Sequence, residues 1–98
     1  YKIANNCNQL AWLLSKTERK SREAIALSRH SLRLRENEPT FLDTLGRCYF
    51  SAGDIDKAIE TQSRALTLVP YERQMKRQLE EFQATKEAAA KEAAAKPR

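Results

Sequence analysis

The stretch KAIETQSRALTL at residues 57–68 decides the fold, because its pattern already stands thirty-four residues earlier as EAIALSRHSLRL at residues 23–34. The identical positions pair Ala24 with Ala58, Ile25 with Ile59, Leu32 with Leu66 and Leu34 with Leu68. Further upstream, Leu10-Ala11 is matched by Leu45-Gly46 at an offset of thirty-five, so the first unit carries one extra loop residue. A period of this length predicts stacked helix–turn–helix units that share one core.

Composition agrees with a single small helical domain. The chain has 98 residues with only two glycines and three prolines, and residues that favour helices dominate it. The net charge of +5 comes from basic residues spread along the chain, and their longest cluster, residues 16–22, is expected to be a solvated loop. No nucleic-acid-reading motif accompanies this charge, so we expect no nucleic-acid partner. No run approaches the roughly 20 apolar residues of a membrane span, so we expect no membrane partner either.

Capping and turn residues place the helices of the first unit. The first helix is expected over residues 3–15, and its inner face is predicted to hold Ile3, Cys7, Leu10, Ala11 and Leu14. Ser21 is expected to cap a second helix that runs to about residue 36.

The second unit has clearer boundaries. Pro39 suits the first turn of a third helix, and Gly53 suits the left-handed position that ends it. Asp54 is expected to cap a fourth helix over residues 55–68. After Pro70 a fifth helix is expected from about residue 71. Inward positions are predicted for Phe41, Leu42, Leu45, Cys48 and Tyr49 in the third helix and for Met75, Leu79 and Phe82 in the fifth.

The last segment differs in kind from the repeats. EAAAK at residues 87–91 is repeated at once at residues 92–96, and each glutamate precedes a lysine by four residues. This composition is typical of a semi-rigid helical spacer. We therefore predict a folded domain over residues 1–86 and an engineered helical linker over residues 87–98.

The second unit resembles the tetratricopeptide repeat family. The matching residues are Leu45-Gly46, Tyr49, Gly53-Asp54, Ala58, Ala65 and Pro70. The first unit matches less well, since Ala11 and Ser31 stand where the family prefers glycine and alanine. The resemblance implies an all-α fold, in which antiparallel helical hairpins stack as a short right-handed α-solenoid of five helices. Repeat one would span about residues 5–38, repeat two residues 39–70, and a capping helix about residues 71–86.

The resemblance also implies a function, because such arrays hold a peptide or partner helix on the concave surface lined by the first helix of each hairpin. Carried over to this sequence, the partner-binding residues would be Asn5, Asn8, Gln9, Trp12, Asp43, Thr44, Arg47, Phe50, Gln74, Arg77 and Gln78. Arg47 and Arg77 could hold a carboxylate, and Trp12 and Phe50 could serve as apolar anchors. Each also has a structural interpretation: Trp12 and Phe50 as packing residues, and Arg47 as the i,i+4 partner of Asp43.

Two function classes remain open at this point. The first is a non-catalytic protein–protein interaction module, and the second is an engineered scaffold that assembles with further copies or a fused module. We expect no enzyme, cofactor or metal site, because no phosphate loop, ligand cluster or nucleophile–base pair is present. Cys7 and Cys48 lack a metal or redox spacing and are expected to be buried free thiols, which suits the cytoplasm.

Overall fold

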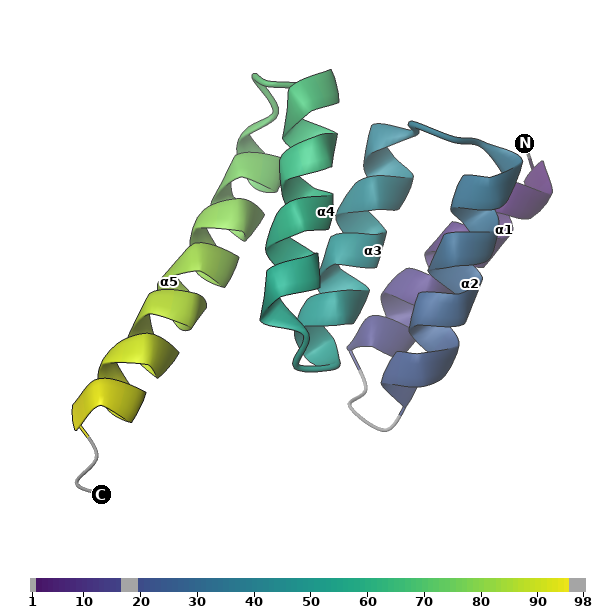
Figure 1. The fold of residues 1–98 in the computed structure, drawn as a ribbon. Helices are drawn as coiled ribbons and strands as arrows, with labels where there is room; N and C mark the ends of the chain where they lie inside the picture. Colours follow the sequence, from purple (N-terminus) through teal and green to yellow (C-terminus); the bar gives the residue numbers. More distant parts are fainter. Residues whose placement is uncertain (1, 17–19, 96–98) are drawn as a thin grey trace.

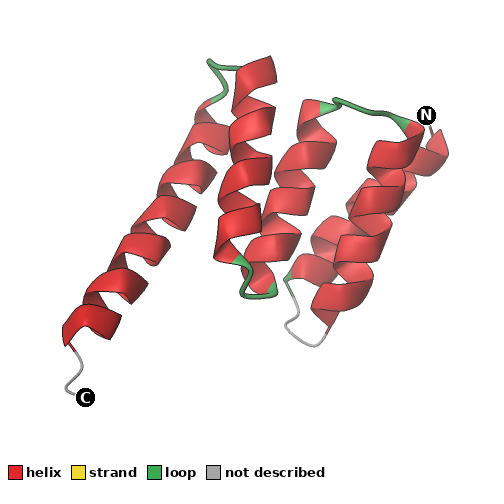
Figure 2. Ribbon diagram, in the orientation of Figure 1, coloured by secondary structure: helices red, strands yellow, loops and turns green. Residues whose placement is uncertain are grey.

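The structure, a computed structural model, describes residues 2–16 and 20–95, and these form an all-α fold of five helices. The helices are α1 (Lys2–Ser15), α2 (Ser21–Leu34), α3 (Pro39–Ser51), α4 (Ile55–Leu68) and α5 (Arg73–Ala95), and short connections join α2 to α3, α3 to α4 and α4 to α5 (Figures 1 and 2). The predicted fold class is thereby confirmed. The loop expected at residues 16–22 lies in part outside the described residues, as do residues 96–98 of the predicted linker.

The helices stack in chain order as antiparallel neighbours. α1 pairs with α2 and α3 pairs with α4, while α3 also packs against both helices of the first hairpin. α5 packs on α4 and touches α3 (Figure 1). The resulting slab measures 51 × 32 × 17 Å, a thickness that accommodates two layers of helices, and α3 contacts all four other helices.

The predicted inner face of α1 is wrong at two of its positions. Ile3 and Leu10 are 68 % and 47 % exposed, whereas Ala11 is buried as expected and Cys7 and Leu14 are half-buried. The residues that α1 buries are Ala4, Asn8, Ala11 and Ser15. Small side chains at this spacing allow close approach of the neighbouring helices, so the contact stripe follows side-chain size instead of hydrophobicity.

The start and end of α2 also differ from the prediction. Lys20 occupies the N-cap position without a side-chain capping bond, and Ser21 is the first helical residue, buried at 9 % exposure. The helix ends at Leu34, two residues before the predicted end, and Asn37 then adopts a left-handed conformation with φ of 58°. Asparagine tolerates this conformation better than most residues, which explains why the chain can turn there.

The boundaries of the second hairpin follow the expected chemistry. Pro39 opens α3, and Gly53 has φ of 86° in the turn that follows the helix. The side chain of Asp54 then accepts a hydrogen bond from the backbone N–H of Lys57 at 3.3 Å. The predicted inward residues Phe41, Leu42, Leu45 and Cys48 are buried, and Tyr49 is half-buried. Turn chemistry and hydrophobic period therefore agree throughout this unit.

α5 begins at Arg73, slightly later than predicted, and runs without a break to Ala95. Phe82 is its one buried residue among those described, with Met75 and Leu79 half-buried. Lys86 Nζ reaches Asp56 Oδ1 on α4 at 2.7 Å, and every described side chain beyond it is exposed. The helical state predicted for residues 87–95 is confirmed, while their engineered origin stays a prediction.

In the described part of the chain, no helix is both long enough and apolar enough to cross a membrane.

Candidate functional site

An open groove lies on the side of the molecule formed by the first helix of each hairpin and by α5. It encloses about 660 Å³. Its lining comes from Trp12, Ser15 and Lys16 at the end of α1, Arg47, Phe50 and Ser51 on α3, and Gln78 on α5. Four residues predicted to bind a partner therefore meet in one place: Trp12, Arg47, Phe50 and Gln78.

Trp12 projects into this groove as an accessible aromatic side chain. Its side chain is 44 % exposed, and the ammonium of Lys16 lies 3.6 Å from the ring centroid, a cation–π arrangement one helical turn long. Ser51 Oγ donates to the carbonyl of Ser15 at 2.6 Å, which ties the end of α1 to α3. The position of Trp12 beside α3 is thereby held by a contact between the two hairpins.

Phe50 has a structural role on the opposite wall. Its ring stacks on the buried ring of Phe82 with 4.5 Å between centroids and 18° between planes. The Arg47 guanidinium lies 5.4 Å from the Phe50 centroid and 5.3 Å from that of Phe82. These contacts join α3 to α5, and they leave Phe50 half-buried with one side toward the groove.

A buried network of long polar side chains stands behind this wall. Gln62 on α4 is fully buried, and its Nε2 donates to Asp43 Oδ1 at 2.6 Å and to the carbonyl of Met75 at 3.0 Å. Gln78 Nε2 donates to the same Asp43 oxygen at 3.0 Å and to Gln62 Oε1 at 2.8 Å. The network therefore joins α3, α4 and α5 through side chains whose amide and carboxylate groups satisfy one another.

Arg47 connects this network to the surface. Its Nε donates to Gln78 Oε1 at 3.0 Å, and its Nη2 lies 3.0 Å from Glu81 Oε2 on α5. The i,i+4 interpretation of Arg47 with Asp43 is thus replaced by an ion pair across helices. The pair is partly exposed, so it contributes well under the roughly 1 kcal/mol upper range of surface bridges.

Gly46 makes room for the network. A Cβ placed on Gly46 would lie 2.6 Å from Gln62 Oε1, closer than real side chains approach, and 3.6 Å from the carbonyl of Ala58. The helices α3 and α4 therefore approach each other closely at Gly46 and Ala58. The absence of a side chain at Gly46 also leaves space for the end of the Gln62 side chain, which the repeat pattern does not reveal.

Burial raises the pKa of the Asp43 carboxyl above its ordinary value of 3.8. The hydrogen bond from Gln62 and the charge of Arg47 act in the opposite direction, and the charge of Glu72 adds to the rise. The loss of hydration is the largest of these causes, so Asp43 carries its charge at a cost that the Gln62 hydrogen bond and the Arg47 charge offset only in part.

The remaining predicted residues lie outside the groove lining. Gln9, Gln74 and Arg77 are exposed, and Asn5 is half-buried. Thr44 is buried and donates to the carbonyl of Thr40 at 3.2 Å. Asn8 is 6 % exposed, and its buried Oδ1 has no hydrogen-bond partner among the residues described. Asp43 belongs to the network behind the wall.

Three residues that line or support the groove were not in the predicted set: Lys16, Ser51 and Gln62. Lys16 and Ser51 stand at helix ends, where a helical period says little about direction. Gln62 could have been found, because it interrupts the inner face of α4 between Ala58 and Ala65, and a buried glutamine requires partners.

The described residues include possible metal ligands and two cysteine thiols. No group of three or more histidine, cysteine, aspartate or glutamate side chains there could hold a metal ion. Cys7 and Cys48 are free, as expected, but only Cys48 is buried, and Cys7 is half-buried. Burial raises the pKa of the Cys48 thiol to about 12, so this sulfur is not a thiolate nucleophile at neutral pH.

The chain matches no protein-family model and no curated protein sequence.

Proposed function

We propose that the protein is a non-catalytic interaction module of the tetratricopeptide type, which holds a peptide or a partner helix in the groove between α1, α3 and α5. The observation that carries the proposal is Trp12, a large aromatic side chain 44 % exposed beside an open groove of about 660 Å³. Tryptophan is among the residue types that contribute most to interface energies.

The groove chemistry specifies the kind of segment that fits. An apolar side chain of the partner would lie between Trp12 and Phe50, where both walls are aromatic. Lys16 stands at the edge of that space without an ion pair to the described carboxylates, so an acidic residue next to the apolar anchor would be favoured. Arg47 is less available, because a ligand carboxylate would have to displace Glu81.

The chain contains a single tryptophan, so its fluorescence reports on the groove directly. Peptides selected from a random library for binding to the whole chain are expected to shift the emission of Trp12 to shorter wavelength as the indole leaves water. Trp12→Ala should reduce affinity by roughly tenfold or more, the loss typical of a central anchor. Gln9→Ala, exposed on the same helix but outside the groove lining, is the matched control.

Peptides that bind equally well to wild type and to Trp12→Ala would show that the groove is not the binding surface.

The second candidate is self-association through the exposed apolar side of α1. Ile3, Leu10 and Leu13 are 68 %, 47 % and 58 % exposed. Leu45 and Cys48, which occupy the positions of Leu10 and Leu13 in the second repeat, are 5 % and 0 % exposed because the first hairpin covers them. A helical hairpin of a second copy is the kind of element that would cover the corresponding side of α1.

Light scattering over a range of concentrations tests this candidate. Leu10→Gln combined with Leu13→Gln should convert a dimer to a monomer, while Leu68→Gln on α4, 44 % exposed, serves as the matched control. A wild-type chain that stays monomeric at all concentrations would refute self-association.

A further inference from the structure

A second pocket lies on the other side of α3, between α2 and α4. It encloses about 640 Å³ and is separate from the groove. Leu45 and Tyr49 of α3 line it, whereas Arg47 lines the groove. Residues 45 and 47 are separated by roughly 200° around a helix axis, so the two openings face away from each other. A ligand in this pocket would leave the groove free.

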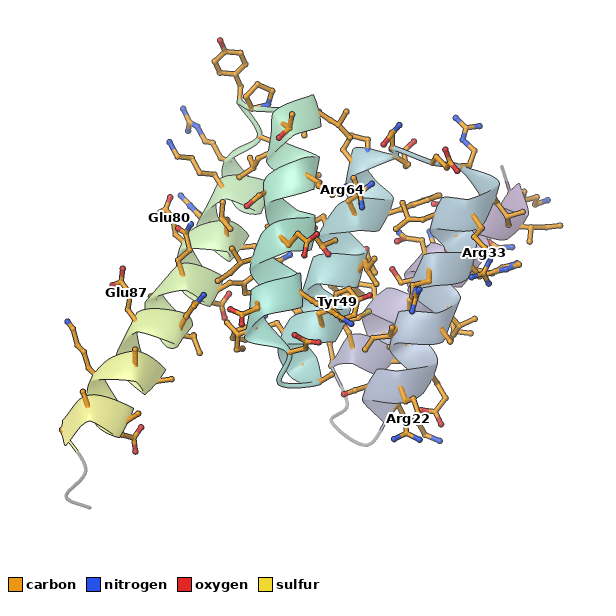
Figure 3. All side chains as sticks on the ribbon, viewed as in Figure 1. Arg22, Arg33, Tyr49, Arg64, Glu80 and Glu87 are labelled. Atoms are coloured by element: carbon orange, nitrogen blue, oxygen red, sulfur yellow. The ribbon has the colours of Figure 1, made fainter. Side chains whose placement is uncertain are left out.

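Arginines dominate the walls of this pocket. Arg29 and Arg33 stand one turn apart on α2, and Arg64 stands across from them on α4. Figure 3 labels Arg33 on α2, Tyr49 on α3 and Arg64 on α4, which together mark the two walls and the floor. The three arginine side chains are exposed, and none forms an ion pair with a carboxylate of the described residues. Arg64 even lacks a bridge to Glu60, which is one turn away.

The floor of the pocket is apolar and aromatic. Leu45 is buried, Tyr49 is half-buried, and Lys57 Nζ lies 5.7 Å from the Tyr49 ring centroid. Lys57 is therefore held over the ring and has Asp54 at 3.9 Å, so it adds positive charge without being the free group. An incoming chain would find an aromatic surface below it and, on both sides, guanidinium groups that form no ion pair with a described carboxylate. Arg33 Nη2 lies 3.4 Å from His30 Nδ1 on its own helix.

We propose that this pocket binds an acidic peptide segment, which the arginines of α2 and α4 hold by its carboxylates. Guanidinium groups recognise carboxylates through paired hydrogen bonds. Arg29 and Arg64 have those donors available, and Arg33 has the donors that its contact with His30 does not use. Two acidic residues, Glu36 and Glu60, also line the pocket. They repel phosphates and ligand carboxylates alike, but a peptide backbone also brings N–H groups that can donate hydrogen bonds to them, and a phosphodiester backbone brings none. The mixed lining therefore favours a peptide over a nucleic acid.

Fluorescence anisotropy with a labelled peptide of six glutamates tests the proposal on the whole chain. The triple variant Arg29→Gln, Arg33→Gln, Arg64→Gln is expected to bind at least about tenfold more weakly than wild type, since charge-assisted bonds at each arginine are lost. A matched triple variant, Arg22→Gln, Arg73→Gln, Lys76→Gln, removes the same charge from exposed positions outside the pocket. It is expected to change affinity by less than about threefold, because it alters only the long-range field.

Two further measurements place the peptide. Amide resonances of Leu45, Tyr49 and Thr61 should shift on titration, and Trp12→Ala should leave the affinity for the acidic peptide unchanged. The second result separates this site from the proposed groove, so either proposal can fail alone.

Three outcomes would overturn the inference: equal losses in the two triple variants, resonance shifts confined to the groove, or tighter binding of single-stranded oligothymidine than of the peptide at the same ionic strength.

Discussion

The two hairpins fill the same buried positions in different ways. Asp43 and Gln62 of the second hairpin occupy the positions of Asn8 and Ser28 in the first, at the repeat offsets of thirty-five and thirty-four. In the second hairpin the two side chains are joined by a 2.6 Å hydrogen bond. In the first, Asn8 Oδ1 and Ser28 Oγ are both buried without a hydrogen-bond partner in the described residues. The Ser28 side chain is too short to reach as far as the Gln62 amide does.

The neighbouring positions change together with these pairs. Gly46 makes room for the long Gln62 side chain, whereas the first repeat has Ala11 at the corresponding position together with the shorter Ser28. The third partner changes as well, since Gln78 reaches into the network while its counterpart Thr44 bonds to the backbone of its own helix. A buried polar position in this repeat is therefore specified by a set of residues together, and replacing one member should reveal the others.

The largest effect is expected from Gln62→Ala. The substitution removes the bonds to Asp43 and to the carbonyl of Met75, leaves Gln78 without one acceptor, and opens a cavity. Unfolding in urea should show a loss of about 3 kcal/mol, the sum of a cavity term and of buried groups left unpaired. A loss below about 1 kcal/mol would show that the network adds little to stability.

Gly46→Ala should have the next largest effect. The new methyl group would collide with Gln62 Oε1, and overpacking of this kind outweighs the helix preference of alanine, for a net loss of about 2 kcal/mol. The double variant Gly46→Ala, Gln62→Ser copies the first hairpin and should lose less than the two single changes added together. Strict additivity in the double-mutant cycle would contradict the coupling between these positions.

The contribution of Asp43 to the stability of the second hairpin should depend on pH. Because burial raises its pKa in the folded state, Asp43 contributes most to stability below 3.8, and that contribution declines as pH rises through the raised value. Asp43→Asn retains the Oδ1 acceptor that both glutamines use, so the stability difference between variant and wild type should shift in favour of the variant from acid to neutral pH.

Urea titrations of both proteins across that pH range measure the difference. Glu87→Gln, in the exposed end of α5, should follow the wild type. A constant difference between Asp43→Asn and the wild type would show that Asp43 has the same pKa folded and unfolded.

The smallest effect is expected from Ser28→Ala. This hydroxyl is buried and has no partner among the described residues, so its removal should leave the unfolding free energy within about 0.5 kcal/mol of wild type, or raise it. The contrast with Gln62→Ala, at the equivalent position, tests the comparison directly. A loss near 2 kcal/mol would indicate a hydrogen bond at Ser28, with buried water the natural candidate.

Most of the fold could be predicted because turn residues and period are local properties. Pro39, Gly53 and Asp54 act within a few residues of themselves, and the structure places each where its backbone preference predicts. The inner face of α1 was harder to predict. Hydrophobicity pointed wrongly to Ile3 and Leu10, while the close packing of helices buried the small residue Ala4 beside the correctly predicted Ala11.

For the candidate site, the sequence predicted residues that share a surface but not the bonds between them. Trp12, Arg47, Phe50 and Gln78 do meet at the groove, as the repeat register implies. Their bonding could not be read from the sequence, because Arg47 and Gln78 meet across helices at a separation of thirty-one residues. One sequence signal was present: a glycine in α3 together with a glutamine on the inner face of α4 indicates a long side chain that needs space.

The packing of Phe82 determines the position of the exposed end of α5. The thirteen helical residues from Gln83 to Ala95 extend roughly 20 Å past this buried ring at 1.5 Å per residue. A tilt of about 10° at Phe82 would therefore move the tip by roughly 3.5 Å, given that rise. Because Phe82 stacks on Phe50 and Lys86 pairs with Asp56, contacts with α3 and α4 set the direction of the exposed end of α5. A partner bound in the groove that displaces Phe50 would therefore change the tilt of α5 and move its far end.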